Sequence, residues 1–205
     1  MEWERPSTAR SSPDPKSDLF SRAGDDTITT AFPGWYRSSE DPWYGYVEGY
    51  RLAADAILQR VEETGLDQDS LVFPFLMCWR HHVELQLKSL ITLMQRGLRA
   101  PVNVPSHHKI DRLWRDTVVL LDQVTAFDED KAISHAERLI LQLHETDPTA
   151  QESRYPMTTK GAPTLESIVY FDMRIFHSGM QEVANFLSGT HVGLSEHFKV
   201  RRDYG

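Results

Sequence analysis

The feature that most constrains the fold is a long amphipathic pattern between about residues 71 and 96. Apolar residues recur there at the spacing of one helix face. They are Leu76, Val83, Leu87, Leu90 and Met94. Ser70 suits the N-cap position and Gly97 suits the C-terminal end of this helix. At a rise of about 1.5 Å per residue, roughly 25 residues predict a helix about 38 Å long.

Four shorter segments carry the same kind of pattern, and no two segments have the alternation of paired strands. We expect these helices at about residues 42–63, 109–124, 128–144 and 164–187. The connections between them suit an up-and-down antiparallel arrangement. The sequence therefore predicts an all-α fold, a bundle of about five helices.

Composition changes at both ends of the chain. Residues 1–33 are rich in Ser, Pro and Asp, which predicts a flexible, disordered N-terminal arm. Residues 34–189 contain all five helical patterns and form the predicted bundle domain. Residues 190–205 are expected to be a tail, made basic by Lys199, Arg201 and Arg202. A chain of 205 residues fits one domain with such extensions.

Composition also disfavours several protein classes. The single cysteine, Cys78, excludes an internal disulfide framework and zinc sites built on several thiols. The first residues lack the apolar segment of a signal peptide. No run of about 18 apolar residues could span a membrane. We therefore expect a soluble, cytoplasmic protein.

Charge is unevenly distributed along the chain. The net charge is −8, which argues against a general nucleic-acid coat. Residues 79–115 nevertheless contain seven basic and two acidic residues, a balance of +5, whereas residues 122–152 have a balance of −6. The basic segment could steer an anionic partner to one side of the protein. The alternative is two complementary or simply solvated surfaces.

Nine histidines raise the question of a metal site. His81-His82 and His107-His108 are adjacent pairs, and adjacent helical residues point about 100° apart, so a pair cannot easily chelate one ion. Neither the di-iron Glu-x-x-His arrangement nor His-Glu-x-x-His occurs, and Gly-rich phosphate loops are absent as well. The sequence predicts no metal and no other cofactor.

Two helical patterns contain polar residues that their apolar stripes do not explain. Arg80, Glu84 and Lys88 lie four residues apart on one face, beside the stripe of the long helix. We expect them to form a half-buried network that fixes the bundle or a ligand, or alternatively a solvated ladder. Asp172 falls on the apolar stripe of the last helix and could face the basic row, or it could lie at the edge of the stripe in water.

Four short blocks together resemble the HEPN superfamily, named for higher-eukaryote and prokaryote nucleotide-binding domains. They are residues 78–88 with Glu84-Leu85-x-Leu87-Lys88, His108-x-Ile110-x-x-Leu113-Trp114, Arg154-Tyr155-Pro156 with Gly161, and Asn185-Phe186-Leu187. Their order and helical placement are mutually consistent. The resemblance spans about residues 43–189.

This resemblance implies a helical bundle that is often a homodimer. Many members are metal-independent ribonucleases of toxin–antitoxin or antiphage systems, whereas others are non-catalytic modules that bind nucleotides, RNA or proteins. The nuclease members carry an Arg followed after four to six residues by a His, and two such motifs meet across the dimer. Here only Arg138 and His144 have this spacing, with Leu139 in place of the usual polar residue.

Charge segregation and the resemblance together predict one anion-binding cleft. Its expected residues are Arg80, His81, Glu84, Lys88, His108, Arg154, Tyr155 and Asp172. Arginine and lysine would supply positive charge, and Tyr155 a surface on which a base could stack. RNA or a nucleotide phosphate is the expected occupant, and the acidic surface of a partner protein such as an antitoxin is the alternative. A ribonuclease, a binding module and a dimerisation scaffold all remain open.

Overall fold

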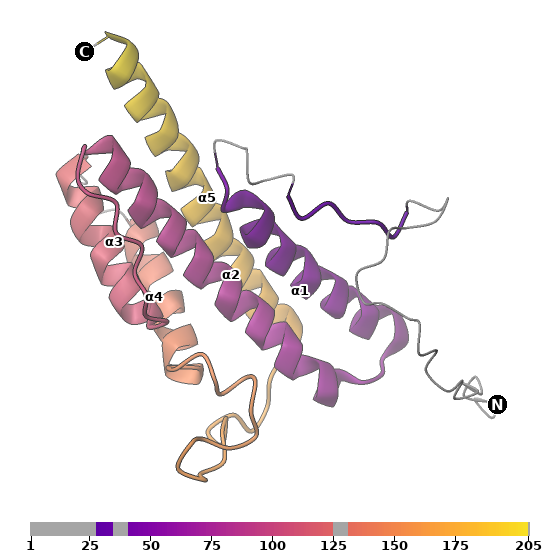
Figure 1. Ribbon diagram of the computed structural model, residues 1–205. Helices are drawn as coiled ribbons and strands as arrows, with labels where there is room; N and C mark the ends of the chain where they lie inside the picture. The colour runs from indigo at the N-terminus through magenta and orange to yellow at the C-terminus, as the bar shows by residue number, and fades with distance from the viewer. Residues whose placement is uncertain (1–27, 35–40, 125–130, 205) are drawn as a thin grey trace, which may run out of the picture.

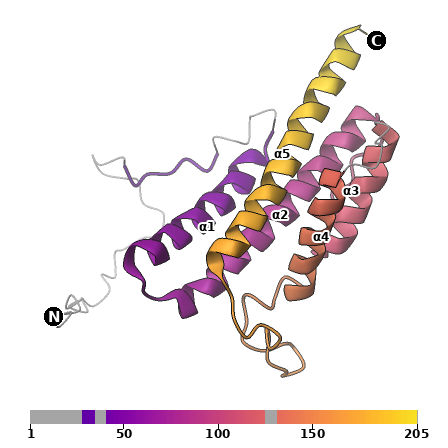
Figure 2. The same ribbon diagram turned by 180° about the vertical axis from the view of Figure 1, so that it is seen from behind.

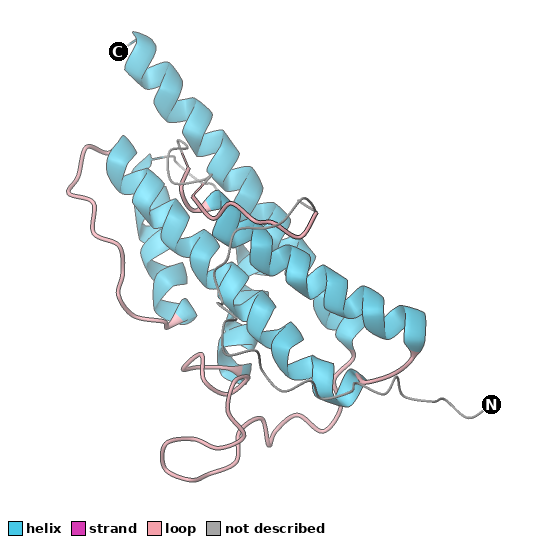
Figure 3. Cartoon of the chain, turned by 45° about the vertical axis from the view of Figure 1, so that its right-hand side comes forward, coloured by secondary structure: helices cyan, strands magenta, loops and turns pink. Residues whose placement is uncertain are grey.

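The structure, a computed structural model, describes residues 28–34, 41–124 and 131–204. It contains five helices: α1 (Tyr44–Thr64), α2 (Gln68–Gly97), α3 (Ile110–Val124), α4 (Lys131–Thr146) and α5 (Met173–Tyr204). Within the described ranges, the only β pairing is an isolated bridge between Met157 and Pro163 (Figure 3). The predicted all-α bundle of five helices is confirmed. Most of the predicted arm, residues 1–27, lies outside the described residues.

Helix α2 is the centre of the bundle, because it contacts α1, α3 and α5 (Figure 1). Its stripe residues Leu76, Val83, Leu87, Leu90 and Met94 are all buried. Gly65 ends α1 in a left-handed conformation and donates its N–H to the carbonyl of Val61, so α1 and α2 form a tight hairpin. Helix α4 completes the bundle by packing on α3 and α5.

One connection departs from simple up-and-down alternation. The 98–109 loop runs back along the bundle after α2, so α3 begins beside the middle of α2 and runs in the same direction (Figures 1 and 2). The side chain of Gln95 holds the start of this return, where its Oε1 accepts the N–H of Asn103 at 2.9 Å. At the end of the return, Arg80 donates to the carbonyl of His108.

The last helix begins later and ends later than the sequence pattern predicts. Thr164 does not cap a helix, because its hydroxyl donates to the carbonyl of Tyr155. Residues 147–172 instead form a long loop at one end of the bundle (Figure 3). Helix α5 starts where Asp172 accepts the N–H groups of Arg174 and Ile175.

The predicted basic tail is wrong, since residues 190–204 are the last four turns of α5. Leu194 is buried in the core there. The ring of Phe198 lies against Gly97, where an added Cβ would be only 2.3 Å from the ring atoms. A glycine at the end of α2 therefore lets α5 continue alongside it before projecting past the other helices (Figures 1 and 2). Across the described residues, no helix is long and apolar enough to cross a membrane.

If residues 190–204 pack as a helix, Leu194→Ala should lower the free energy of unfolding by about 2–5 kcal/mol, as for a buried leucine. Val200→Ala on the same helix is the control, because Val200 is exposed and should change it by less than about 0.5 kcal/mol. Urea denaturation measures both variants. Equal, small losses would show that this segment is a tail.

Candidate functional site

A buried carboxylate organises the candidate site. Glu84 is 1% exposed, and its Oε2 accepts from the guanidinium of Arg80 at 3.1 Å. Its Oε1 accepts from Lys88 Nζ at 2.9 Å and from His108 Nδ1 at 2.8 Å. The predicted network of Arg80, Glu84 and Lys88 is therefore present. It is buried rather than half-buried, and it is not a solvated ladder.

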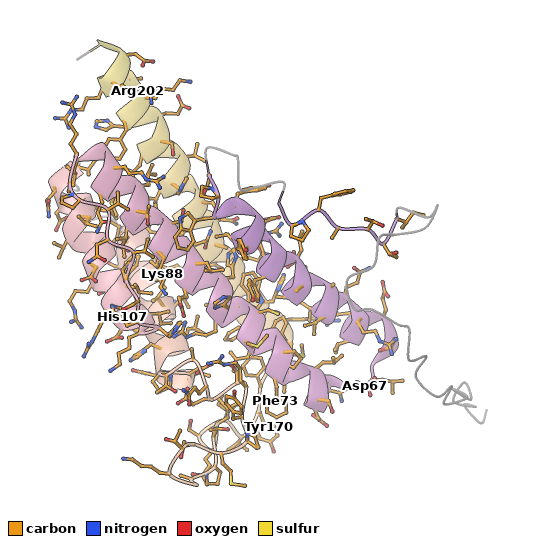
Figure 4. The ribbon with its side chains drawn as sticks, viewed as in Figure 1. Asp67, Phe73, Lys88, His107, Tyr170 and Arg202 are labelled. Atoms are coloured by element: carbon orange, nitrogen blue, oxygen red, sulfur yellow. The ribbon has the colours of Figure 1, made fainter. Side chains whose placement is uncertain are left out.

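Helix geometry brings the three α2 residues together, because residues four apart are neighbours on one face. The same residues fasten two loops to α2. Arg80 Nε donates to the carbonyl of Asp147, after α4, at 3.2 Å, and its terminal nitrogen donates to the carbonyl of His108. Figure 4 shows His107, in the 98–109 loop, beside the part of α2 that carries Lys88. The network thus positions both loops that border the site.

Opposing effects act on the ionisation of Glu84. Burial alone would raise its pKa, because a charge is costly away from water. Hydrogen bonds from Lys88 and His108, with the charges of Lys88 and Arg80, outweigh burial, so the pKa lies below its usual value of 4.5. Glu84 is consequently ionised at neutral pH.

A cleft of about 150 Å³ lies against this network. Segments far apart in the sequence border it: α1, α2, the 98–109 loop and the loop after α4. Five of the predicted binding residues line the cleft, namely Arg80, His81, Glu84, His108 and Arg154. The cleft also has lining residues that the sequence did not indicate, among them Asp147 and Ser153, because their loop has no periodic pattern.

The two histidines of the cleft are held differently. His81 packs edge-on against Tyr50, with ring centroids 4.4 Å apart, and burial lowers its pKa, so it is neutral at pH 7. His108 has a 60% exposed side chain. Because the ionised Glu84 only accepts hydrogen bonds, His108 Nδ1 carries a proton in this contact. The cleft therefore offers two imidazoles, a neutral one at His81 and one at His108 whose Nδ1 donates to Glu84.

The loop after α4 is folded on itself and presents Arg154. Asp147 is buried and accepts from the hydroxyl of Ser153 at 2.6 Å and from the N–H of Glu152 at 3.1 Å. Burial raises the pKa of Asp147. The guanidinium of the exposed Arg154 lies 5.9 Å from the ring centre of Tyr155, whose side chain is also exposed. Tyr155 thus lies next to the cleft but is not among its lining residues.

Three of the predicted site residues lie elsewhere. Asp172 is exposed at the start of α5, so it does not face the basic row, and of the two alternatives the position in water is the one observed. Arg138 is exposed and contacts His135 Nδ1 at 3.2 Å, whereas His144 Nε2 lies 3.6 Å from Asp111. Six residues along one helix are about 240° apart, so α4 does not bring Arg138 and His144 together within one chain.

Lys88 belongs to the network but does not line the cleft, because its ammonium group is buried against Glu84. Among the residues that the structure describes, no group of three or more His, Cys, Asp or Glu side chains could hold a metal ion. Cys78 is buried, and burial raises the pKa of its thiol. The cleft itself is lined by polar side chains, among them Arg80, His81 and Ser153.

Comparison with known proteins found no matching family model, no similar curated protein and no similar solved structure.

The network predicts a large effect of Glu84→Gln on stability. The change keeps the shape but leaves the charges of Arg80 and Lys88 buried without their counter-ion. We expect the free energy of unfolding to fall by about 3 kcal/mol, measured by urea denaturation. The control is Glu62→Gln, which weakens an exposed pair with Arg174 and should cost less than about 1 kcal/mol.

Lowering the pH provides a second test of the Glu84 charge with the same variant. Because the folded-state pKa of Glu84 lies below the unfolded value of 4.5, its stabilising contribution is complete above pH 4.5 and is lost as the pH falls through the folded value. The stability difference between the parent protein and Glu84→Gln should therefore shrink in acid. A loss below about 0.5 kcal/mol at neutral pH would contradict the role given to the charge.

Proposed function

We propose that the protein is a HEPN-like binding module that holds the phosphate of a nucleotide or an RNA strand in this cleft. The observation that supports the proposal is the convergence of His81, His108 and Arg154, from three separate segments, at one opening lined by Arg80. Histidine and arginine side chains are common donors to phosphate oxygens. A structural role alone would not require an arginine and a histidine at the solvent side of the network.

The distribution of charge supports one position for the anion within the cleft. Glu84 and Asp147 oppose Arg80 on the inner side, where the guanidinium already uses three of its five N–H groups in its three contacts. Arg154 lies at the rim and is exposed. A phosphate group would thus lie near Arg154 and His108. Tyr155, exposed beside Arg154, would supply the stacking surface for a base.

The biological setting that we propose follows from the resemblance to HEPN proteins. It is an RNA-targeting toxin or antiphage component that acts in the cytoplasm as a homodimer, with an antitoxin as a possible protein partner. The charge balance of +5 over residues 79–115 is compatible with an RNA ligand.

RNA binding can be tested with a fluorescent single-stranded oligonucleotide at low salt. We expect Arg154→Ala to weaken binding and to reduce the salt dependence by about one phosphate contact. Arg60→Ala removes the same charge from the exposed end of α1 and should leave binding unchanged. Fluorescence anisotropy over a salt series measures both quantities. Equal binding by the two variants, or none by the parent protein, would favour a protein-binding module instead.

Metal-independent RNA cleavage is the second candidate function, favoured by the Glu84–His108 hydrogen bond and the neutral His81 in one cleft. His81 could accept the proton of a 2′-hydroxyl as that oxygen attacks the adjacent phosphorus. His108, when it carries a proton on both ring nitrogens, could give the Nε2 proton to the leaving 5′-oxygen, so the products would carry a 2′,3′-cyclic phosphate and a 5′-hydroxyl. The resemblance instead assigns cleavage to Arg138 and His144 of two chains.

A cleavage assay in EDTA distinguishes these assignments. If the cleft is the catalytic site, His108→Ala should reduce the cleavage rate at least about 100-fold, because proton transfer by a positioned side chain contributes a factor of that size. Arg138→Ala should leave the cleavage rate unchanged. The reverse pattern would assign the chemistry to Arg138 and His144. Binding without cleavage by the parent protein would establish the non-catalytic module. Induced expression in a bacterial host, scored for growth and RNA integrity, extends the comparison to cells.

A further inference from the structure

Exposed basic side chains gather where the end of α2 meets the last turns of α5. The contact of Phe198 with Gly97 joins the two helices there. The basic residues on either side of this contact are called the basic end: Arg96, Arg99, Lys199, Arg201 and Arg202. All five are exposed. Figure 4 shows Arg202 on the part of α5 that projects past the other helices.

The positive charge of the basic end is largely uncompensated. Residues 95–99 and 196–203 contain these five basic residues and two acidic ones, Glu196 and Asp203, a balance of +3. Arg202 lies 3.4 Å from Asp203, and no other residue of the basic end has an ion pair within the described ranges. A second copy of this surface would be repelled, whereas an anionic partner would be attracted.

The 98–109 loop connects the basic end to the phosphate cleft. It starts within the basic end, and its His108 lines the cleft. The loop is largely exposed and contains Arg99 and Lys109 but no acidic residue. Gln95 fixes its course, because the side-chain amide bonds both the N–H of Asn103, at 2.9 Å, and its carbonyl, at 3.4 Å.

The distance suits a short stretch of nucleic acid. Thirteen residues of α2 separate Glu84, behind the cleft, from Gly97, which corresponds to about 20 Å along the helix axis. At about 3.4 Å per stacked nucleotide, roughly six nucleotides span it.

The other surfaces that leave the cleft are less favourable for a chain of phosphates. Residues 147–172 contain two basic and four acidic residues. A cavity of about 230 Å³ opens between α1, α2 and α5, but its charged lining residues are Asp41, Glu48 and Arg51. Arg51 is already paired with Glu48 and Asp55. The 98–109 loop is therefore the route on which a phosphate chain meets the fewest opposing charges.

We propose that the basic end binds the phosphate backbone of single-stranded RNA, and that a strand held in the cleft reaches it along the 98–109 loop. The inference rests on the proposed function, because the strand begins in the cleft. A groove of positive charge that follows the backbone is a common way of binding single strands. RNA fits better than an acidic protein because its phosphates recur at regular intervals, as the separated cations require.

The test compares two fluorescent RNAs by anisotropy over a salt series. One is a dinucleotide, too short to leave the cleft, and the other has about 12 nucleotides. The double variant Arg96→Ala/Arg201→Ala removes one cation from each helix, and alanine preserves both helices. It should weaken binding of the longer RNA and reduce its salt slope by about 0.7 for each lost phosphate contact. Binding of the dinucleotide should be unchanged.

The matched control is Arg60→Ala/Arg174→Ala. It removes two exposed arginines at the opposite end of the bundle, where Arg174 pairs with Glu62 near the end of α1. The control should bind the longer RNA like the parent protein. Equal salt slopes for the two double variants would overturn the inference, and so would an equal loss of dinucleotide binding by Arg96→Ala/Arg201→Ala.

Two further measurements separate the remaining outcomes. Arg154→Ala should weaken binding of both RNAs, so it tests the cleft independently of the basic end. If only Arg154→Ala has an effect, the proposed function stands and the extended path is wrong. Polyglutamate bound by the parent protein as tightly as the longer RNA would also overturn the inference and would assign the basic end to an acidic protein partner.

Discussion

A single buried carboxylate constrains the rest of this fold. Glu84 is ionised in the middle of the central helix, and an isolated charge there would be strongly destabilising. It is tolerated because three donors from α2 and the 98–109 loop surround it. The return of the chain along α2 before α3 begins brings His108 to Glu84. Helix α3 consequently starts beside the middle of α2 and not beside its end.

The sequence was informative where periodicity and burial coincide. The stripe of α2 and the row Arg80, Glu84, Lys88 predict both the core helix and its network, because spacing along a helix determines which residues share a face. Five of the eight residues predicted for the cleft do line it, and that prediction came from charge segregation and the resemblance, not from spacing. Asp147 and Ser153 could not be predicted, because their loop is placed by contacts with Arg80 and with itself and not by any local pattern.

The errors at α5 have a different origin. A carboxylate at position 172 fits an inner stripe by its spacing and a helix start by its hydrogen-bonding chemistry, and spacing alone does not distinguish the two. The structure selects the second, because Asp172 accepts two N–H groups of the first turn. The sequence pattern also did not predict the last turns of α5, because the basic residues there suggested a tail. Their packing depends on Gly97 of α2, which is far away in sequence.

The pair His81-His82 shows how one helix can serve two sites. Adjacent side chains on a helix point about 100° apart, which argues against joint binding of one metal ion. In the structure this angle directs His81 to the cleft beside Glu84 and His82 to the cavity between α1, α2 and α5. Burial lowers the pKa of both rings, but only the environment of His82 leaves a buried nitrogen unpaired. Glu84 and Gln86 are two residues apart and therefore point about 200° apart, so a charged network and a neutral amide occupy different faces of α2. The central helix therefore carries a charged network beside a cleft on one side, and the neutral side chains of His82 and Gln86 beside a cavity on the other.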